Sequence, residues 1–238
     1  MARDTADVGR PGEYSIGIFN PLKVGVADGV ELQVQPLLFF VAPNVLFRVA
    51  HGEVGGFRWA SEWGAYCPTP LMKLTQGYAF PTWAKQGGQI GWFLVPSAGI
   101  VGTYGERTGS TLTFNADLTV GIPLTHNDAT GPGSIAPVDD LLAPVTTGMR
   151  FRAQATYDLA LLSWLRARMY LGVSLHGKNP SPITMNGGGA FDFAVGKYSR
   201  VTLGFMWWNS DSGAIDYRTH QHVRSNDFFP TIDFIWAG

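Results

Sequence analysis

Charged side chains are scarce in this chain of 238 residues. Aspartate, glutamate, lysine and arginine make up 15% of it, whereas a soluble domain usually carries about 25%. The apolar content of 45% is nevertheless ordinary, and the formal net charge is -1. A near-neutral chain has no basic stripe for nucleic acid, so we predict no nucleic-acid partner. Few charges with ordinary apolarity are typical of a β-barrel in lipid, which turns an apolar face outward and a mostly uncharged polar face inward.

Cysteine occurs once, at Cys67, which excludes an intramolecular disulfide and a cysteine-based metal site. The chain also has no phosphate loop and no H-E-x-x-H or G-x-S-x-G motif. We therefore predict no metal and no cofactor. The first residues are polar and lack the apolar core of a signal peptide. We interpret the chain as a mature form with a start methionine, in which residues 1–12 are a polar extension and residues 13–238 form one domain.

Long apolar runs are missing as well. The longest stretch without a charge, residues 86–105, is interrupted by Pro96 and six glycines. A transmembrane helix needs about 20 predominantly apolar residues without such interruptions, so the sequence offers no candidate for one. The chain instead contains 30 glycines, 15 prolines and 13% aromatic residues. This composition favours strands and turns over helices.

The dominant pattern is an alternation of apolar and polar residues with a period of two. In residues 111–124 one phase holds leucine, phenylalanine, valine and isoleucine, and the other holds mainly threonine, asparagine and aspartate. Successive side chains of a strand point to opposite faces, so this pattern predicts one long strand. The same reasoning predicts eleven strands, at residues 13–26, 30–41, 45–52, 57–66, 90–104, 110–124, 147–160, 165–176, 183–195, 200–209 and 224–236.

Closed bacterial barrels normally have an even number of strands, so one strand must be split or missed near residues 13–55 or 67–89. We predict twelve strands, with ten as the alternative. Short connections, such as Asp28-Gly29, alternate with longer ones that are rich in glycine, proline and asparagine. That alternation is typical of a transmembrane barrel, which has tight turns at one end and long loops at the other.

Strand length and side-chain size indicate which face lies inside. Residues 112–124 at about 3.4 Å each span roughly 40 Å, which at a tilt near 45° covers a height of about 30 Å. The apolar phase is bulky, and a soluble barrel would have to pack it into one narrow interior. We therefore predict an all-β, closed, antiparallel up-and-down transmembrane β-barrel with an apolar, lipid-facing exterior and a polar lumen. The soluble alternative is a lipocalin-like barrel that binds an apolar ligand.

The last strand, Asp227 to Trp236, alternates and ends in an aromatic residue. With this strand, the chain resembles the small outer-membrane β-barrel proteins of Gram-negative bacteria over nearly its whole length, by pattern rather than by motif. The resemblance implies a bacterial outer membrane, lipids or detergent as surroundings, and a C-terminal strand that is read by the barrel-assembly machinery. Ala237 and Gly238 follow the aromatic residue here, which departs from the family's terminal aromatic. The pattern leaves the oligomeric state open.

The polar phase carries the charged side chains that we predict to line the lumen. They are Arg48, Arg58, Glu62, Asp117, Arg150, Arg152, Asp158, Arg166, Arg168, Asp192 and Arg200, and Glu31 and Asp233 share their phase. Four of the arginines lie on one hairpin and would repel one another unless carboxylates or anions compensate them. We predict interior salt bridges that fill a narrow barrel; the alternative is an arginine-lined path that selects anions. The aromatic girdles of such barrels would be formed by Trp59, Trp63, Trp83, Trp92, Trp207 and Trp236.

The sequence offers little evidence for an enzyme. Ser174 and His176 share a face at a strand end, and His126 opens a long loop. The resembling family includes lipases and lipid A deacylases in which a histidine activates a serine, but a serine and a histidine two residues apart often occur by chance. We favour a structural or narrow-pore membrane protein with a charged, largely filled lumen and no enzymatic activity. An outer-membrane enzyme acting on phospholipid or lipid A is the alternative.

Overall fold

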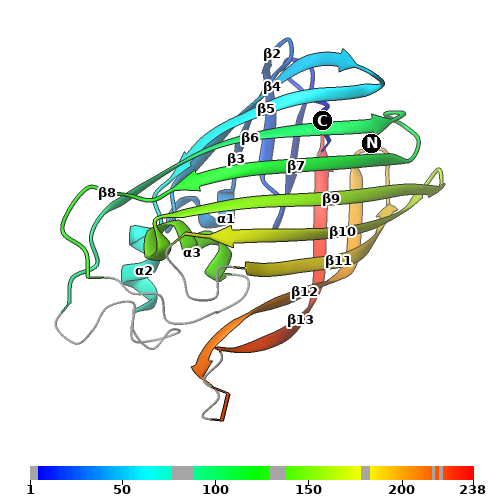
Figure 1. Ribbon diagram of the computed structural model, residues 1–238. Helices are drawn as coiled ribbons and strands as arrows, with labels where there is room; N and C mark the ends of the chain where they lie inside the picture. The colour runs from blue at the N-terminus through cyan, green and yellow to red at the C-terminus, as the bar shows by residue number, and fades with distance from the viewer. Residues whose placement is uncertain (1–4, 77–87, 129–137, 178–182, 216–217, 220–221) are drawn as a thin grey trace.

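The computed structural model describes residues 5–76, 88–128, 138–177, 183–215, 218–219 and 222–238 (Figure 1). Its strands are β1 (Tyr14–Gly17), β2 (Leu22–Ala27), β3 (Val30–Val34), β4 (Asn44–Val54), β5 (Phe57–Tyr66), β6 (Phe93–Gly105), β7 (Thr111–Val120), β8 (Ile122–Pro123), β9 (Met149–Leu162), β10 (Leu165–His176), β11 (Ile183–Ala194), β12 (Ser199–Ile215) and β13 (His222–Ala237). Its helices are α1 (Pro36–Phe39), α2 (Thr69–Thr75) and α3 (Val138–Thr147).

The strands form one closed antiparallel sheet. Neighbours follow the order β5-β4-β3-β2-β1-β13-β12-β11-β10-β9-β7-β6-β8, and a pairing of β5 with β6 closes the ring. Twelve of the strands in the described ranges make up the barrel, while the two-residue β8 pairs only with the start of β6. The prediction of a twelve-stranded, closed antiparallel barrel is therefore confirmed.

The missing twelfth strand arises where one long strand was predicted at residues 13–26. The chain forms β1, turns at Asn20-Pro21 and returns as β2. Proline fixes its own φ and disfavours helical backbone in the residue before it, which suits a turn. The Asp233 carboxylate holds that turn, because it accepts hydrogen bonds from the Ile18 and Phe19 amides at 2.9 and 3.1 Å.

Two further predicted strands differ from the structure. The second half of the predicted strand at residues 30–41 is the helix α1, which begins at Pro36, a residue that is favoured in the first helical turn. The predicted strand at residues 110–124 ends as β7 at Val120 and resumes only as β8. At Gly121, between them, a side chain would meet the Pro144 carbonyl oxygen at 2.0 Å, so α3 packs directly on this point.

The connections are short at one end of the barrel and long at the other. At the short-turn end the strands are joined by residues 28–29, 55–56, 106–110, 163–164 and 195–198. Both chain termini lie at this end, whereas α2 and α3 gather at the opposite, long-loop end (Figure 1). There, Met72 of α2 and Leu142 of α3 form a small apolar cluster with Phe93 and Val95 of β6. No helix in the described ranges has the length and apolar content that crossing a membrane requires.

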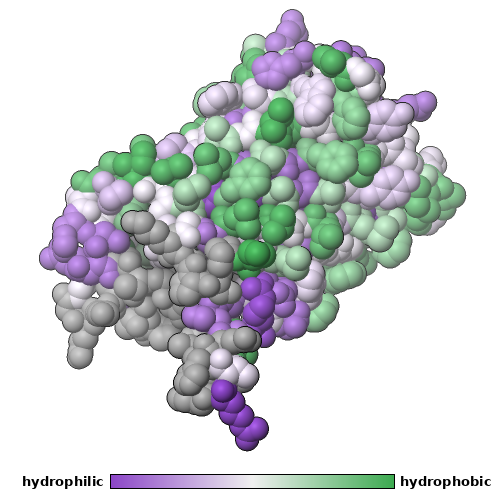
Figure 2. All heavy atoms as spheres, in the orientation of Figure 1, coloured by the Kyte–Doolittle hydropathy of each residue, from purple (hydrophilic) through white to green (hydrophobic). Residues whose placement is uncertain are grey.

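The barrel wall is apolar outside and polar inside. On β10, Leu171 is 62% exposed, while its neighbours Arg168 and Ser174 are buried. Phe228 of β13 is 67% exposed in the same way. Figure 2 shows hydrophobic residues over much of the middle of the wall. This arrangement confirms the predicted lipid-facing exterior, and it does not favour the lipocalin-like alternative, because a soluble barrel would bury these large side chains.

Candidate functional site: the charged lumen

Arg48 and Glu62 form an ion pair across the lumen side of strands β4 and β5. The register places the two residues directly opposite each other, and both are buried. The Arg48 Nε donates to Glu62 Oε1 at 2.9 Å, and the Asn115 amide donates to the other carboxylate oxygen at 3.3 Å. The β4 and β5 pattern thus pairs opposite charges as cross-strand neighbours, which stabilises a sheet face.

Three of the four arginines of the β9–β10 hairpin are paired with carboxylates. Asp117 of β7 accepts from Arg150 Nη2 at 2.9 Å and from Arg152 Nε at 2.7 Å. Asp158 accepts two hydrogen bonds from Arg168, at 3.1 and 3.2 Å.

The fourth arginine of the hairpin, Arg166, donates to the main-chain carbonyls of Thr108 and Gly109 at 3.2 and 2.5 Å. These guanidiniums therefore meet internal acceptors rather than facing an open path.

The remaining charged residues of the predicted set are also in or beside the lumen. Asp192 is buried and accepts a hydrogen bond from the Thr202 hydroxyl at 2.6 Å. Arg200 lines a cavity at the short-turn end. Arg58 pairs with Asp7, a residue of the N-terminal segment that was predicted as an extension outside the barrel domain.

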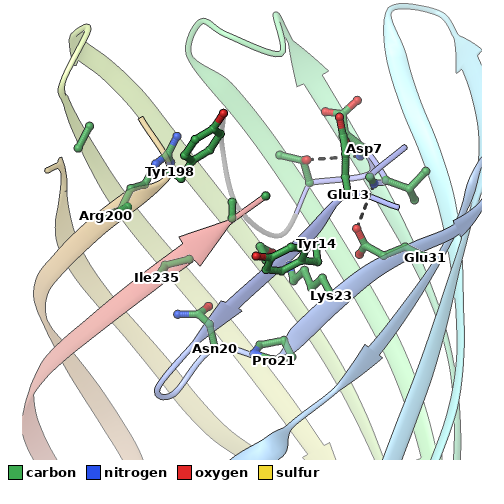
Figure 3. A pocket seen from close by; sticks show the side chains of 18 of the residues that line it. Asp7, Glu13, Tyr14, Asn20, Pro21, Lys23, Glu31, Tyr198, Arg200 and Ile235 are labelled. Atoms are coloured by element: carbon green, nitrogen blue, oxygen red, sulfur yellow. Dashed lines mark hydrogen bonds between the residues drawn. The ribbon is translucent and has the colours of Figure 1, made fainter. Parts of the chain in front are cut away.

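Two cavities lie between described residues of the lumen. The larger one, about 610 Å³, lies toward the short-turn end between Arg200 and Tyr198 on one side and Glu13 and Glu31 on the other (Figure 3). The smaller one, about 240 Å³, is lined by Gln33, Gln35, Asn44, Tyr66, Asp117, Arg150 and Arg152. Arg48 lines the first cavity and Glu62 the second, so this ion pair lies between them.

Residues 5–9 lie inside the barrel, and the exposed residues 10–13 connect them to β1, whereas the sequence predicted residues 1–12 as an extension outside the barrel domain. Thr5 and Ala6 are buried, and residues 5, 7, 8, 9 and 13 line the larger cavity. A signal for this placement exists in the sequence. Ala60 of β5 and Val101 of β6 put apolar side chains among the polar inward residues Arg58, Glu62 and Thr103, and they form a buried cluster with Ala6.

The candidate catalytic residues are not arranged as a serine–histidine pair. Ser174 and His176 are both buried on the lumen side of β10, but Ser174 Oγ has no hydrogen-bond partner among the described residues. A histidine activates a serine through such a hydrogen bond. His126 instead contacts Asp128 at 3.1 Å in an exposed loop. There, the hydrogen bond from the Gln89 amide, with His126 nearby, lowers the pKa of Asp128.

The tryptophans that were predicted as girdles occupy several environments. Trp63, Trp92 and Trp236 are exposed, Trp59 and Trp207 are half-buried, and Trp83 lies outside the described residues. Their role at the membrane interfaces stays a prediction. Next to Trp207, Trp208 is buried on the lumen side, a position that the sequence analysis did not single out. No group of three or more potential metal ligands occurs within the described ranges.

Comparison with known proteins gives structural neighbours only. No family model matches the chain, and no curated protein matches it. The barrel is similar to OmpT of Vibrio cholerae expressed in the outer membrane, with a TM-score of 0.48, 8% identity, and coverage of 92% of this chain and 64% of that one. It is also similar to in-vitro folded OmpT of the same organism, with a TM-score of 0.43, 8% identity, and coverage of 94% and 64%. The chain thus spans less than two thirds of the length of these proteins, and no function transfers at this identity.

Proposed function

We propose that this protein is a narrow pore of a bacterial outer membrane, with a charged and largely filled lumen that passes small ions. The observation that carries the proposal is the position of the Arg48–Glu62 pair between two lumen cavities of about 610 and 240 Å³. Open space with a partly polar lining thus lies on both sides of one polar partition. A path that ions could follow is interrupted by side chains rather than by a packed apolar core.

The chemistry of the lumen supports a small conductance. Arg150 and Arg152 share Asp117, and Arg168 pairs with Asp158. Paired charges leave a polar, hydrated surface but little net field to select one sign of ion, in contrast to rings of unpaired charge. We therefore expect small currents with weak selectivity.

The location and the assembly route belong to the same proposal. β13 presents Phe228, Ile232 and Trp236 on its exposed face. An alternating last strand of this kind fits recognition by the barrel-assembly machinery of the outer membrane. The exposed apolar wall fits membrane lipid as its surroundings, or detergent after extraction.

Planar-bilayer recording of the refolded protein tests the proposal. The wild type should add small, discrete conductance steps, and Arg48→Ala combined with Glu62→Ala should enlarge them, because the partition between the cavities is removed. Glu53→Gln, at an exposed position of β4, is the matched control and should leave the steps unchanged. A barrel that migrates as folded on an unheated gel but carries no current, in the wild type and the double variant alike, would contradict the pore.

A further inference from the structure

We propose that residues 5–13 form a plug, with residues 5–9 inside the barrel, that closes the short-turn end of the lumen and leaves it as a unit. The ion pairs of Asp7 hold this plug in place. The effect on current rests on the proposed pore function, whereas the placement and release of the segment do not. In Figure 3 the segment runs beside Glu31 and Lys23 at the edge of the larger cavity.

The barrel wall provides an apolar seat for the segment. Ala6 is buried against Ala60 of β5 and Val101 of β6. Those two wall positions belong to strands whose other inward residues include Arg58, Glu62 and Thr103. Small apolar side chains have no evident use on a wet lumen wall, so their coincidence with Ala6 indicates that the wall is built to receive this segment.

Hydrogen bonds fix the main chain of the segment at several points. The Arg48 guanidinium donates to the Thr5 carbonyl at 2.8 Å, and the Ala6 amide donates to the Thr103 hydroxyl at 2.8 Å. Further on, the Gly9 amide donates to Glu31 Oε2 at 3.1 Å. Since Arg48 also pairs with Glu62, the plug touches the partition between the two cavities.

Asp7 joins the segment to two different parts of the barrel. Its carboxylate accepts two hydrogen bonds from Arg58 of β5, at 2.8 and 3.1 Å. It also contacts Arg107 Nε at 2.9 Å, and Arg107 lies in the exposed turn between β6 and β7. The Asp7 side chain is 3% exposed, so loss of its charge would leave Arg58 without this compensation.

Gly25 of β2 shows how closely the segment approaches the wall. The Gly12 amide donates to the Gly25 carbonyl, and the Gly25 amide donates to the Glu13 carbonyl, both at 2.9 Å. A Cβ atom at position 25 would meet the Arg10 carbonyl oxygen at 2.0 Å. Any side chain here must push the plug away, while β2 itself keeps its extended conformation.

The segment is attached by noncovalent contacts of its own and is not a strand of the barrel. It forms one wall of the larger cavity through residues 5, 7, 8, 9 and 13. Its removal would therefore join that cavity to the space it occupies and widen the lumen at the short-turn end. The twelve-strand ring would remain, because the ring begins at β1.

Thiol labelling of a cysteine in the plug tests the inference without reference to current. In a Cys67→Ser background, Ala6→Cys should react slowly with a membrane-impermeant maleimide, because position 6 is buried in the seat. Adding Asp7→Asn should raise the labelling rate at least tenfold. Adding Gly25→Ala, whose side chain on β2 displaces the segment, should also raise the labelling rate at least tenfold. Glu13→Gln removes an equal charge from the same segment, where that side chain contacts the Arg10 amide, and should leave the rate unchanged.

The same variants, recorded in planar bilayers, separate the two proposals. Asp7→Asn and Gly25→Ala should enlarge the conductance steps several-fold, with gel mobility confirming folded barrels. Faster labelling without any current in any variant supports the plug and overturns the pore. If labelling of Cys67→Ser/Ala6→Cys is already fast, or if neither Asp7→Asn nor Gly25→Ala raises the labelling rate above that of this parent, the plug is overturned.

Discussion

At the scale of single residues, the lumen is organised by carboxylates that each hold more than one partner. Asp117 serves Arg150 and Arg152, and Asp7 serves Arg58 and Arg107. A carboxylate can accept from two guanidiniums because it offers two oxygens with several lone-pair sites. Removing both arginines from such a group therefore strands a buried negative charge rather than deleting a weak surface contact.

This arrangement predicts the behaviour of the Arg150→Gln and Arg152→Gln double variant. The Asp117 carboxylate would stay buried without its two cationic partners, and stranding such a charge costs about 3–5 kcal/mol. We expect the free energy of unfolding in detergent to fall by about that amount, while the reversal potential under a salt gradient stays at its wild-type value. Glu53→Gln is the exposed control. A reversal potential that moves toward cation preference with unchanged stability would show that the arginines act on passing ions instead.

At the scale of strands and helices, the period-two pattern predicted the residues that belong to the wall and the face on which each lies. It also predicted charge partners for the β9–β10 hairpin, since Asp117 and Asp158 share the inward phase with its arginines. Periodicity could not show the turn inside residues 13–26, because the alternation is nearly continuous across it. Nor could it predict the short helix α1, or α2 and α3, which pack together at the long-loop end.

The β1–β2 turn gives a prediction at this scale. Asp233 of β13 accepts the Ile18 and Phe19 amides and the amide of Phe234, the last at 2.8 Å. A hydrogen bond to a charged group contributes about 1.5–3 kcal/mol. Asp233→Ala should therefore lower the free energy of unfolding by at least about 2 kcal/mol, measured by urea titration in lipid vesicles.

Asp227 lies on the same strand, and its carboxylate accepts a hydrogen bond from the Ser225 hydroxyl at 3.0 Å. Asp227→Ala is thus the matched control, and its cost should stay below about 1 kcal/mol. Equal losses in the two variants would mean that the turn does not depend on its carboxylate cap.

At the scale of the whole molecule, the outer wall determines the surroundings of the barrel and the lumen determines how much open space it encloses. Its outer wall requires an apolar solvent, and its lumen is occupied by the chain's own N-terminal segment. The sequence indicated the first through bulky residues in one phase, because that signal is local to each strand. The sequence does carry a local sign of the second, the apolar Ala60 and Val101 in the inward phase. That sign does not identify the segment that covers them, because the contacts of Ala6 and Asp7 join residues that are far apart in the chain and follow no repeat.

Arginine substitution on the outer wall tests the membrane orientation of the whole barrel. Leu171 lies near the middle of β10 and Leu162 at the short-turn end of β9, and their side chains are 62% and 52% exposed. In a bilayer, an arginine near the midplane costs about 2–4 kcal/mol, whereas one near the interface costs about 0–1 kcal/mol. Leu171→Arg should therefore lower the free energy of unfolding of the barrel in vesicles by about 2–4 kcal/mol relative to the wild type, and Leu162→Arg by about 1 kcal/mol or less.

In water, either substitution would be nearly neutral, because the side chain is already exposed. Equal and small effects at both positions would contradict a membrane-spanning wall, while a large effect at Leu171 alone places the centre of the bilayer on β10.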